Sequence, residues 1–163
     1  MTLTDAKTGG TTAPRSPGPT ASAPRPRARG ELGSEPVERL EAEAIDLSAR
    51  LASGTYELLV LVGELDHRGS WATWGALSCA AWLADCCGIE VGTARTQVRV
   101  ARAMRQFPAL DQAMASGDVS YAKARVLAAY LTDANIDALL AIAETTPAGR
   151  LGAAIAAWSQ RND

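Results

Sequence analysis

Four arginines at regular spacing are the side chains of this sequence best suited to bind another molecule. They are Arg95, Arg99, Arg102 and Arg105. Their intervals of four, three and three residues place them along one side of an α-helix. Guanidinium groups form paired hydrogen bonds with phosphates and with the edge of guanine. Together with Thr93, at the predicted start of the same helix, these arginines are the predicted contacts to DNA.

The helix that carries the arginines is predicted to be the second half of a helix-turn-helix unit. A short helix capped by Ser78 runs through Cys87 and ends at Gly88, and Thr93 is the predicted N-cap of a longer helix that runs to Phe107. A helix, a tight glycine-containing turn and a second helix with basic residues near its start are typical of DNA-binding units of this kind.

The competing interpretation is that the arginines of this helix form ion pairs within the protein instead of binding DNA. Ala94, Val98 and Ala101 form a stripe beside the arginines and are predicted to face the core. The arginines would then pair with an acidic helix, and the first predicted helix carries suitable carboxylates. These are Glu35, Glu38, Glu41, Glu43 and Asp46. Two functions therefore stay open: a helical accessory domain that contacts DNA, and a helical module for protein interaction or self-association without nucleic-acid binding.

Residues suited to catalysis or metal binding are scarce. The sequence has one histidine, His67, and three cysteines, Cys79, Cys86 and Cys87, without a CxxC pair. Metal sites and acid–base pairs usually combine several such groups. The chain also lacks the glycine-rich loops of nucleotide-binding proteins and the GxSxG motif of hydrolases. We expect no enzymatic activity, no catalytic residue, no metal and no cofactor.

The composition favours an all-α fold. Apolar residues make up 47% of the chain, and the abundant alanine has the highest helix propensity. Caps, glycines and prolines divide residues 34–163 into a predicted bundle of about eight helices. The predicted helices begin at or just after Ser34, Thr55, Ser78, Thr93, Pro108, Ser120, Thr132 and Thr146. Trp82 is predicted to be largely buried against the helix that follows it.

Residues 1–33 differ from this helical domain in composition. They hold five of the eight prolines and few apolar side chains, so they are predicted to form a disordered tail. The net charge of −2 excludes a uniformly basic nucleic-acid binder. Neither a membrane-spanning run nor a signal peptide is recognisable, so no membrane association and a cytoplasmic location are expected.

Several short motifs follow one another in a characteristic order: Asp66–Gly69 with Trp71, Ser78–Leu83, Gly92–Arg95, Pro108–Leu110 and Gly117–Lys123. These motifs resemble those of the 13E12 repeat family, also known as domain of unknown function 222. The resemblance covers roughly residues 37–160 and implies a helical domain. Longer members of the family look like such a domain followed by an HNH nuclease domain, which implies roles in DNA processing or in mobile elements.

The resemblance carries no catalytic residue over to this chain. An HNH site uses histidines to bind a metal and activate water, and no histidine follows His67 before the last residue, Asp163. We therefore expect the nuclease domain to be absent and the chain to correspond to a truncated, N-terminal helical part.

Overall fold

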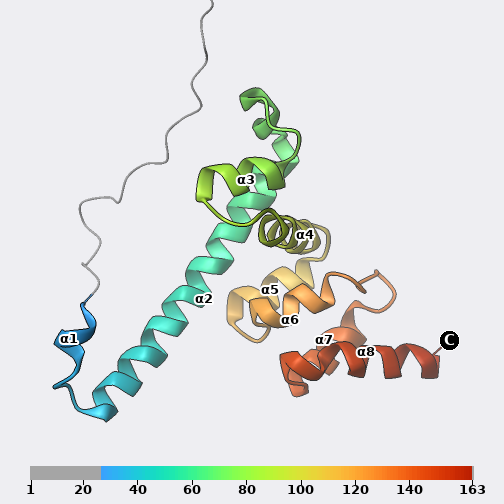
Figure 1. Cartoon of the computed structure of the whole chain (residues 1–163). Coiled ribbons are helices and arrows are strands. Elements are labelled where there is room, and N and C mark those ends of the chain that lie inside the picture. Colours follow the sequence, from blue (N-terminus) through green and yellow to red (C-terminus); the bar gives the residue numbers. More distant parts are fainter. Residues whose placement is uncertain (1–26, 163) are drawn as a thin grey trace, which may run out of the picture.

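All regular secondary structure in the part that the structure describes is helical. A computed structural model describes residues 27–162 (Figure 1), and this part contains eight α-helices, one 3₁₀-helix and no strand. In chain order the elements are α1 (Arg29–Leu32), α2 (Val37–Arg68), η1 (Ser70–Trp74), α3 (Cys79–Cys87), α4 (Val91–Gln106), α5 (Pro108–Ser116), α6 (Tyr121–Leu127), α7 (Ile136–Thr145) and α8 (Ala148–Asn162). The prediction of an all-α fold with about eight helices is confirmed.

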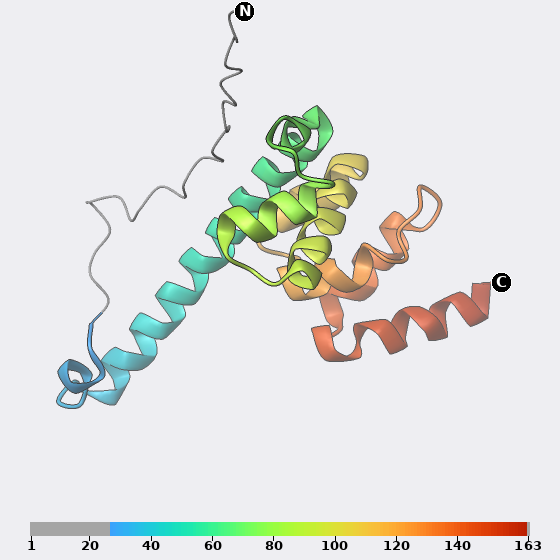
Figure 2. The same ribbon diagram turned by 45° about the horizontal axis from the view of Figure 1, so that its top comes forward.

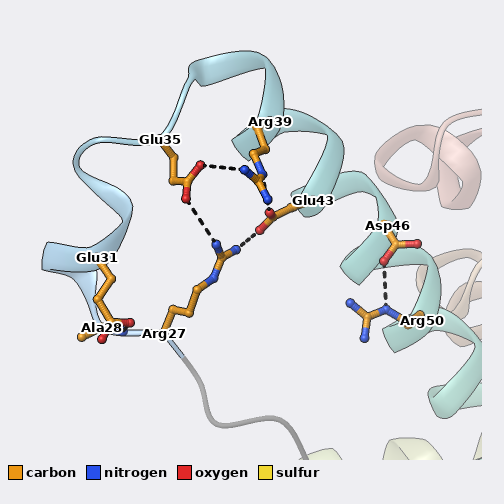
Figure 3. A network of polar contacts seen from close by, with 8 residues as sticks. All are labelled: Arg27, Ala28, Glu31, Glu35, Arg39, Glu43, Asp46 and Arg50. Atoms are coloured by element: carbon orange, nitrogen blue, oxygen red, sulfur yellow. Dashed lines mark hydrogen bonds and ion pairs between the residues drawn. The ribbon is translucent and has the colours of Figure 1, made fainter.

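The predicted tail overlaps the described residues only at its end. Residues 1–26 lie outside the described part. The segment that follows contains the single helical turn α1, and Arg27 forms an ion pair with Glu43 of α2 (Figure 3). Helical structure therefore begins before Ser34, the predicted boundary of the folded domain.

Helix α2 is one continuous helix of 32 residues, whereas the sequence predicted two. The predicted start of a second helix at Thr55 is wrong, because its hydroxyl donates to the Leu51 carbonyl at 2.8 Å and is satisfied inside the helix. The helix ends at Gly69, whose φ of 64° is readily adopted by glycine. At 1.5 Å per residue α2 is about 48 Å long, and its N-terminal half projects away from the other helices (Figure 1 and Figure 2).

Helix α4 lies at the centre of the body and packs against α2, α3, α5 and α6. Its residues Ala94, Val98 and Ala101 are buried, as predicted. Gly63 of α2 faces α4 closely, since a Cβ on it would lie 3.3 Å from the Ala101 carbonyl oxygen. The missing side chain thus permits the close approach of the two helices. Other large, fully buried side chains are Leu59, Leu83, Leu110, Leu127, Leu139, Leu151 and Ile155.

Local signals locate several helix ends correctly. The hydroxyls of Ser78 and Ser120 each accept a backbone N–H three residues further on, at 3.1 and 3.3 Å, as N-caps do. Pro108 is the first residue of α5, directly after α4, and Gly117 ends α5 with a φ of 87°. These boundaries agree with the sequence analysis.

Two threonines predicted to start helices do not do so. Helix α4 begins two residues before Thr93, and its N-cap is Glu90, whose carboxylate accepts the Thr93 N–H at 3.0 Å. Helix α7 begins at Ile136, because the Thr132 N–H donates to Asn135 Oδ1 at 2.7 Å and closes a turn before the helix. Carboxylate and amide oxygens compete with hydroxyls for exposed backbone N–H groups.

Trp82 is half-buried, which differs from the prediction that it is largely buried. Its ring packs against the core, and its indole nitrogen has no hydrogen-bond partner among the described residues. The neighbouring Leu83 is 1% exposed and is the large α3 side chain that the core encloses. Of these two neighbours, Leu83 is thus more completely buried in the core than Trp82.

Candidate nucleic-acid interface on helix α4

Helices α3 and α4 form a packed pair joined by a turn of residues 88–90. Gly88 adopts a left-handed conformation with a φ of 63°, which lets the chain reverse at the end of α3. Backbone N–H groups of Gly92 and Thr93 donate to the Glu90 carboxylate and lower its pKa. Thr93 is thus not the N-cap of α4. It lies in the first turn of the helix, where its side chain is exposed.

The C-terminal half of the arginine row is ion-paired with α2. Arg102 donates from Nε and Nη2 to the two oxygens of Asp66, at 2.6 and 2.8 Å. Arg105 donates to Glu64 at 2.6 Å. The carboxylates that pair with α4 thus come from the last turns of α2. The acidic residues near the start of α2 either pair with other arginines or have no ion pair among residues 27–162.

Acidic residues near the start of α2 form their own network. Glu35 and Glu43 pair with Arg27 and Arg39, and Asp46 pairs with Arg50 (Figure 3). These contacts lie on the projecting half of α2 and on Arg27 and Glu35, which flank α1. The hypothesis that the first helix neutralises the arginine row is therefore wrong for these residues.

The Asp66 carboxylate is the most enclosed charge of the α2–α4 contact, with a side chain that is 12% exposed. The hydrogen bonds from Arg102 lower its pKa, and they outweigh burial, which raises it. A carboxylate with a lowered pKa in the folded state stabilises that state above its ordinary pKa of about 3.9. The stabilisation is lost as the pH falls through the folded-state value.

Replacing Asp66 with Asn should therefore lower the free energy of unfolding at pH 7. The free energy of unfolding should then also decrease less between about pH 5 and about pH 2 than it does in the native chain. Urea denaturation at several pH values measures both effects. Asp46→Asn is the matched control, because the Asp46–Arg50 pair is exposed on both sides and exposed pairs contribute little. An acid dependence of Asp66→Asn equal to that of the native chain would contradict this account.

Arg95 and Arg99, in the N-terminal half of the row, are exposed and have no ion pair within the described part of the chain. The charge of Arg95 contributes to lowering the pKa of Glu90, after the backbone N–H groups that bind its carboxylate. Its carboxylate is already engaged by two backbone N–H groups. Both guanidinium groups are thus free to bind an external anion.

A groove of about 520 Å³ runs beside these arginines. Arg95, Arg99 and Arg102 line it from α4, Ser78 lines it from the α3 N-cap, and Leu131 lines it from the segment after α6. The structure therefore gathers three of the five predicted site residues at one concave surface. Thr93 and Arg105 do not line this groove.

Helix α6 supplies a cation that the sequence analysis did not single out. The Arg125 guanidinium lies over the Tyr121 ring, 6.0 Å from its centre. Burial raises the pKa of Tyr121, and the positive charges of Arg125 and Arg99 oppose that rise. The positive charges of both arginines thus act on the same tyrosine, although they are 26 residues apart in the sequence. The only signal in the sequence is the spacing of four residues between Tyr121 and Arg125.

Groups that could support catalysis or metal binding are dispersed. His67 is exposed at the end of α2, Cys79 is buried, Cys86 is half-buried and Cys87 is exposed. Burial raises the pKa of the Cys79 thiol. Within residues 27–162 no three histidine, cysteine or carboxylate side chains gather as a metal site would require. No helix in that range combines the length and apolar character needed to cross a membrane.

Comparison with known proteins identifies a family. Residues 35–161 match the family model described as a domain of unknown function, DUF222. No curated protein and no solved structure matches the chain.

Proposed function

The chain belongs to the DUF222 family, and we propose that it is a non-enzymatic helical domain that contacts duplex DNA through the N-terminal half of α4. The observation that carries the proposal is the presence of two exposed arginines, Arg95 and Arg99, without ion pairs in the described part of the chain. The charges of Arg99 and Arg125 both act on the Tyr121 hydroxyl and oppose the rise of its pKa.

The position of the free arginines suits the way that helix-turn-helix proteins bind DNA. In those proteins the second helix contacts the bases through residues near its N-terminus, while the preceding helix supports it. Thr93, Arg95 and Arg99 occupy the first three turns of α4, and α3 packs against that helix. The α3–turn–α4 pair would thus act as the reading unit.

The ion pairs separate the four arginines into two that stabilise the fold and two that are available for binding. Arg102 and Arg105 hold α4 against the end of α2 through Asp66 and Glu64, so their charges are largely compensated. The DNA contacts would be made by Thr93, Arg95 and Arg99, with Arg125 reaching the adjoining backbone. This set is smaller than the predicted row and adds one residue to it.

Binding of the native chain to a fluorescently labelled duplex, followed by anisotropy at several salt concentrations, tests the proposal. Two to three phosphate contacts predict that log Kd rises with log salt concentration with a slope of about 2 to 3. Absence of binding at low salt, or binding that does not change with salt, would overturn it.

A further inference from the structure

Apolar residues of the projecting half of α2 recur at alternating intervals of three and four residues. They are Val37, Leu40, Ala44, Leu47 and Leu51, here called the α2 stripe. This spacing is that of the a and d positions of a coiled coil. Leu58 and Leu65 continue the series toward the body, where they are half-buried.

The α2 stripe is left largely uncovered by the described part of the chain. Val37 is 63% exposed, Leu47 48% and Leu51 63%. The buried residues of α2 are Leu59, Val62 and Gly63, which all belong to its second half. Figure 2 shows the first half extending away from the body, with α1 beside its start.

A helix of this length gains most of its stability in water from packing of its apolar face. The projecting half of α2 has such a face but little to pack against, so the structure indicates a missing partner. Residues 1–26 are a poor candidate for it, because Met1 and Leu3 are the large apolar side chains in that segment.

We infer that the α2 stripe is a dimerisation surface and that its partner is the same stripe of a second copy of this chain. A surface that pairs with itself around a two-fold axis must be complementary to itself. Beside the stripe is a hollow of about 680 Å³, lined by Leu32, Leu40, Ala44 and Leu47. Its charged lining residues are three arginines and two carboxylates: Arg27, Arg39, Arg50, Glu43 and Asp46.

The charges favour an antiparallel pair of helices. With Ala44 opposite Leu47 of the second copy, Leu40 lies opposite Leu51, so four of the five stripe residues are paired and Val37 lies opposite Gly54. In this register the flanking residue Glu43 lies near Arg50 of the second copy, and the symmetry makes that contact twice. In a parallel pair the same flanking positions would place Glu43 near Ser48 and Arg50 near Thr55, without an ion pair.

Sedimentation velocity of the full chain without DNA, from about 1 to about 200 μM, tests this inference independently of the proposed function. The native chain should pass from monomer to dimer as its concentration rises. Leu47→Glu should raise the dimer dissociation constant by more than about 100-fold, because each dimer would bury two unpaired carboxylates.

Ile45→Glu is the matched control, since Ile45 is 72% exposed on the same helix but lies outside the α2 stripe. It should dimerise as the native chain does. Leu51→Glu repeats the test at a second stripe position if Leu47→Glu loses helical circular dichroism. A native chain that stays monomeric at all concentrations, a Leu47→Glu variant that still dimerises, or equal losses in Leu47→Glu and Ile45→Glu would overturn the inference.

Discussion

Replacing Leu83 with alanine is expected to lower the free energy of unfolding by about 2–5 kcal/mol. Leu83 lies on α3, is 1% exposed and belongs to the core that surrounds α4. Its truncation removes buried methyl groups and leaves a cavity that the rigid helix pair can only partly close. Because α3 positions the start of α4, the same change should also weaken DNA binding.

The matched control for this substitution is Leu77→Ala, which deletes the same atoms two residues before the start of α3. Leu77 is 94% exposed, so its truncation should change stability by less than about 0.5 kcal/mol. Urea denaturation followed by tryptophan fluorescence and circular dichroism measures both variants. Equal stabilities of Leu83→Ala and Leu77→Ala would show that α3 does not pack as described.

Removing the two free arginines together should produce the largest loss of DNA affinity. The double variant Arg95→Ala, Arg99→Ala is expected to weaken binding about tenfold or more at low salt. It should also lower the salt slope by about two, one for each phosphate contact. Both side chains are exposed, so the free energy of unfolding should change by less than about 0.5 kcal/mol for each substitution. Anisotropy titrations across salt concentrations measure the effect.

Arg105→Ala is the control that separates a specific interface from a general effect of positive charge. It removes an arginine from the same helix, but one that is paired with Glu64. This variant should keep the native salt slope, whereas the double variant should not. If Arg105→Ala reduces the slope by about one, as the loss of a phosphate contact would, the ion pairs do not determine which arginines bind DNA, and the proposed division of the row is wrong.

Four helix boundaries followed from the sequence, and the contact that fixes each of them is local. Ser78 and Ser120 cap the helices that they precede, and Gly88 and Gly117 end α3 and α5. In each case the relevant bond joins residues within one turn, so residue types alone indicate it. The prediction failed at Thr55, where the hydroxyl bonds to the preceding turn instead of capping a new helix.

The periodicity of α4 likewise determined which of its faces is buried. Ala94, Val98 and Ala101 were expected in the core and lie there, because apolar side chains along one face of a helix are driven out of water together. The arginines had to occupy the side next to this stripe. The sequence by itself therefore established an all-α fold and a helix with one buried and one basic face.

Only the tertiary structure decided which of those arginines stay free. The partners of Arg102 and Arg105 are 36 and 41 residues away in the chain. They reach α4 because α2 continues unbroken through Thr55 and crosses α4 near Gly63. Coulombic attraction acts over a few ångströms whatever the separation in sequence. The path of α2 thus brings carboxylates to Arg102 and Arg105, whereas Arg95 and Arg99 have no ion pair among the described residues.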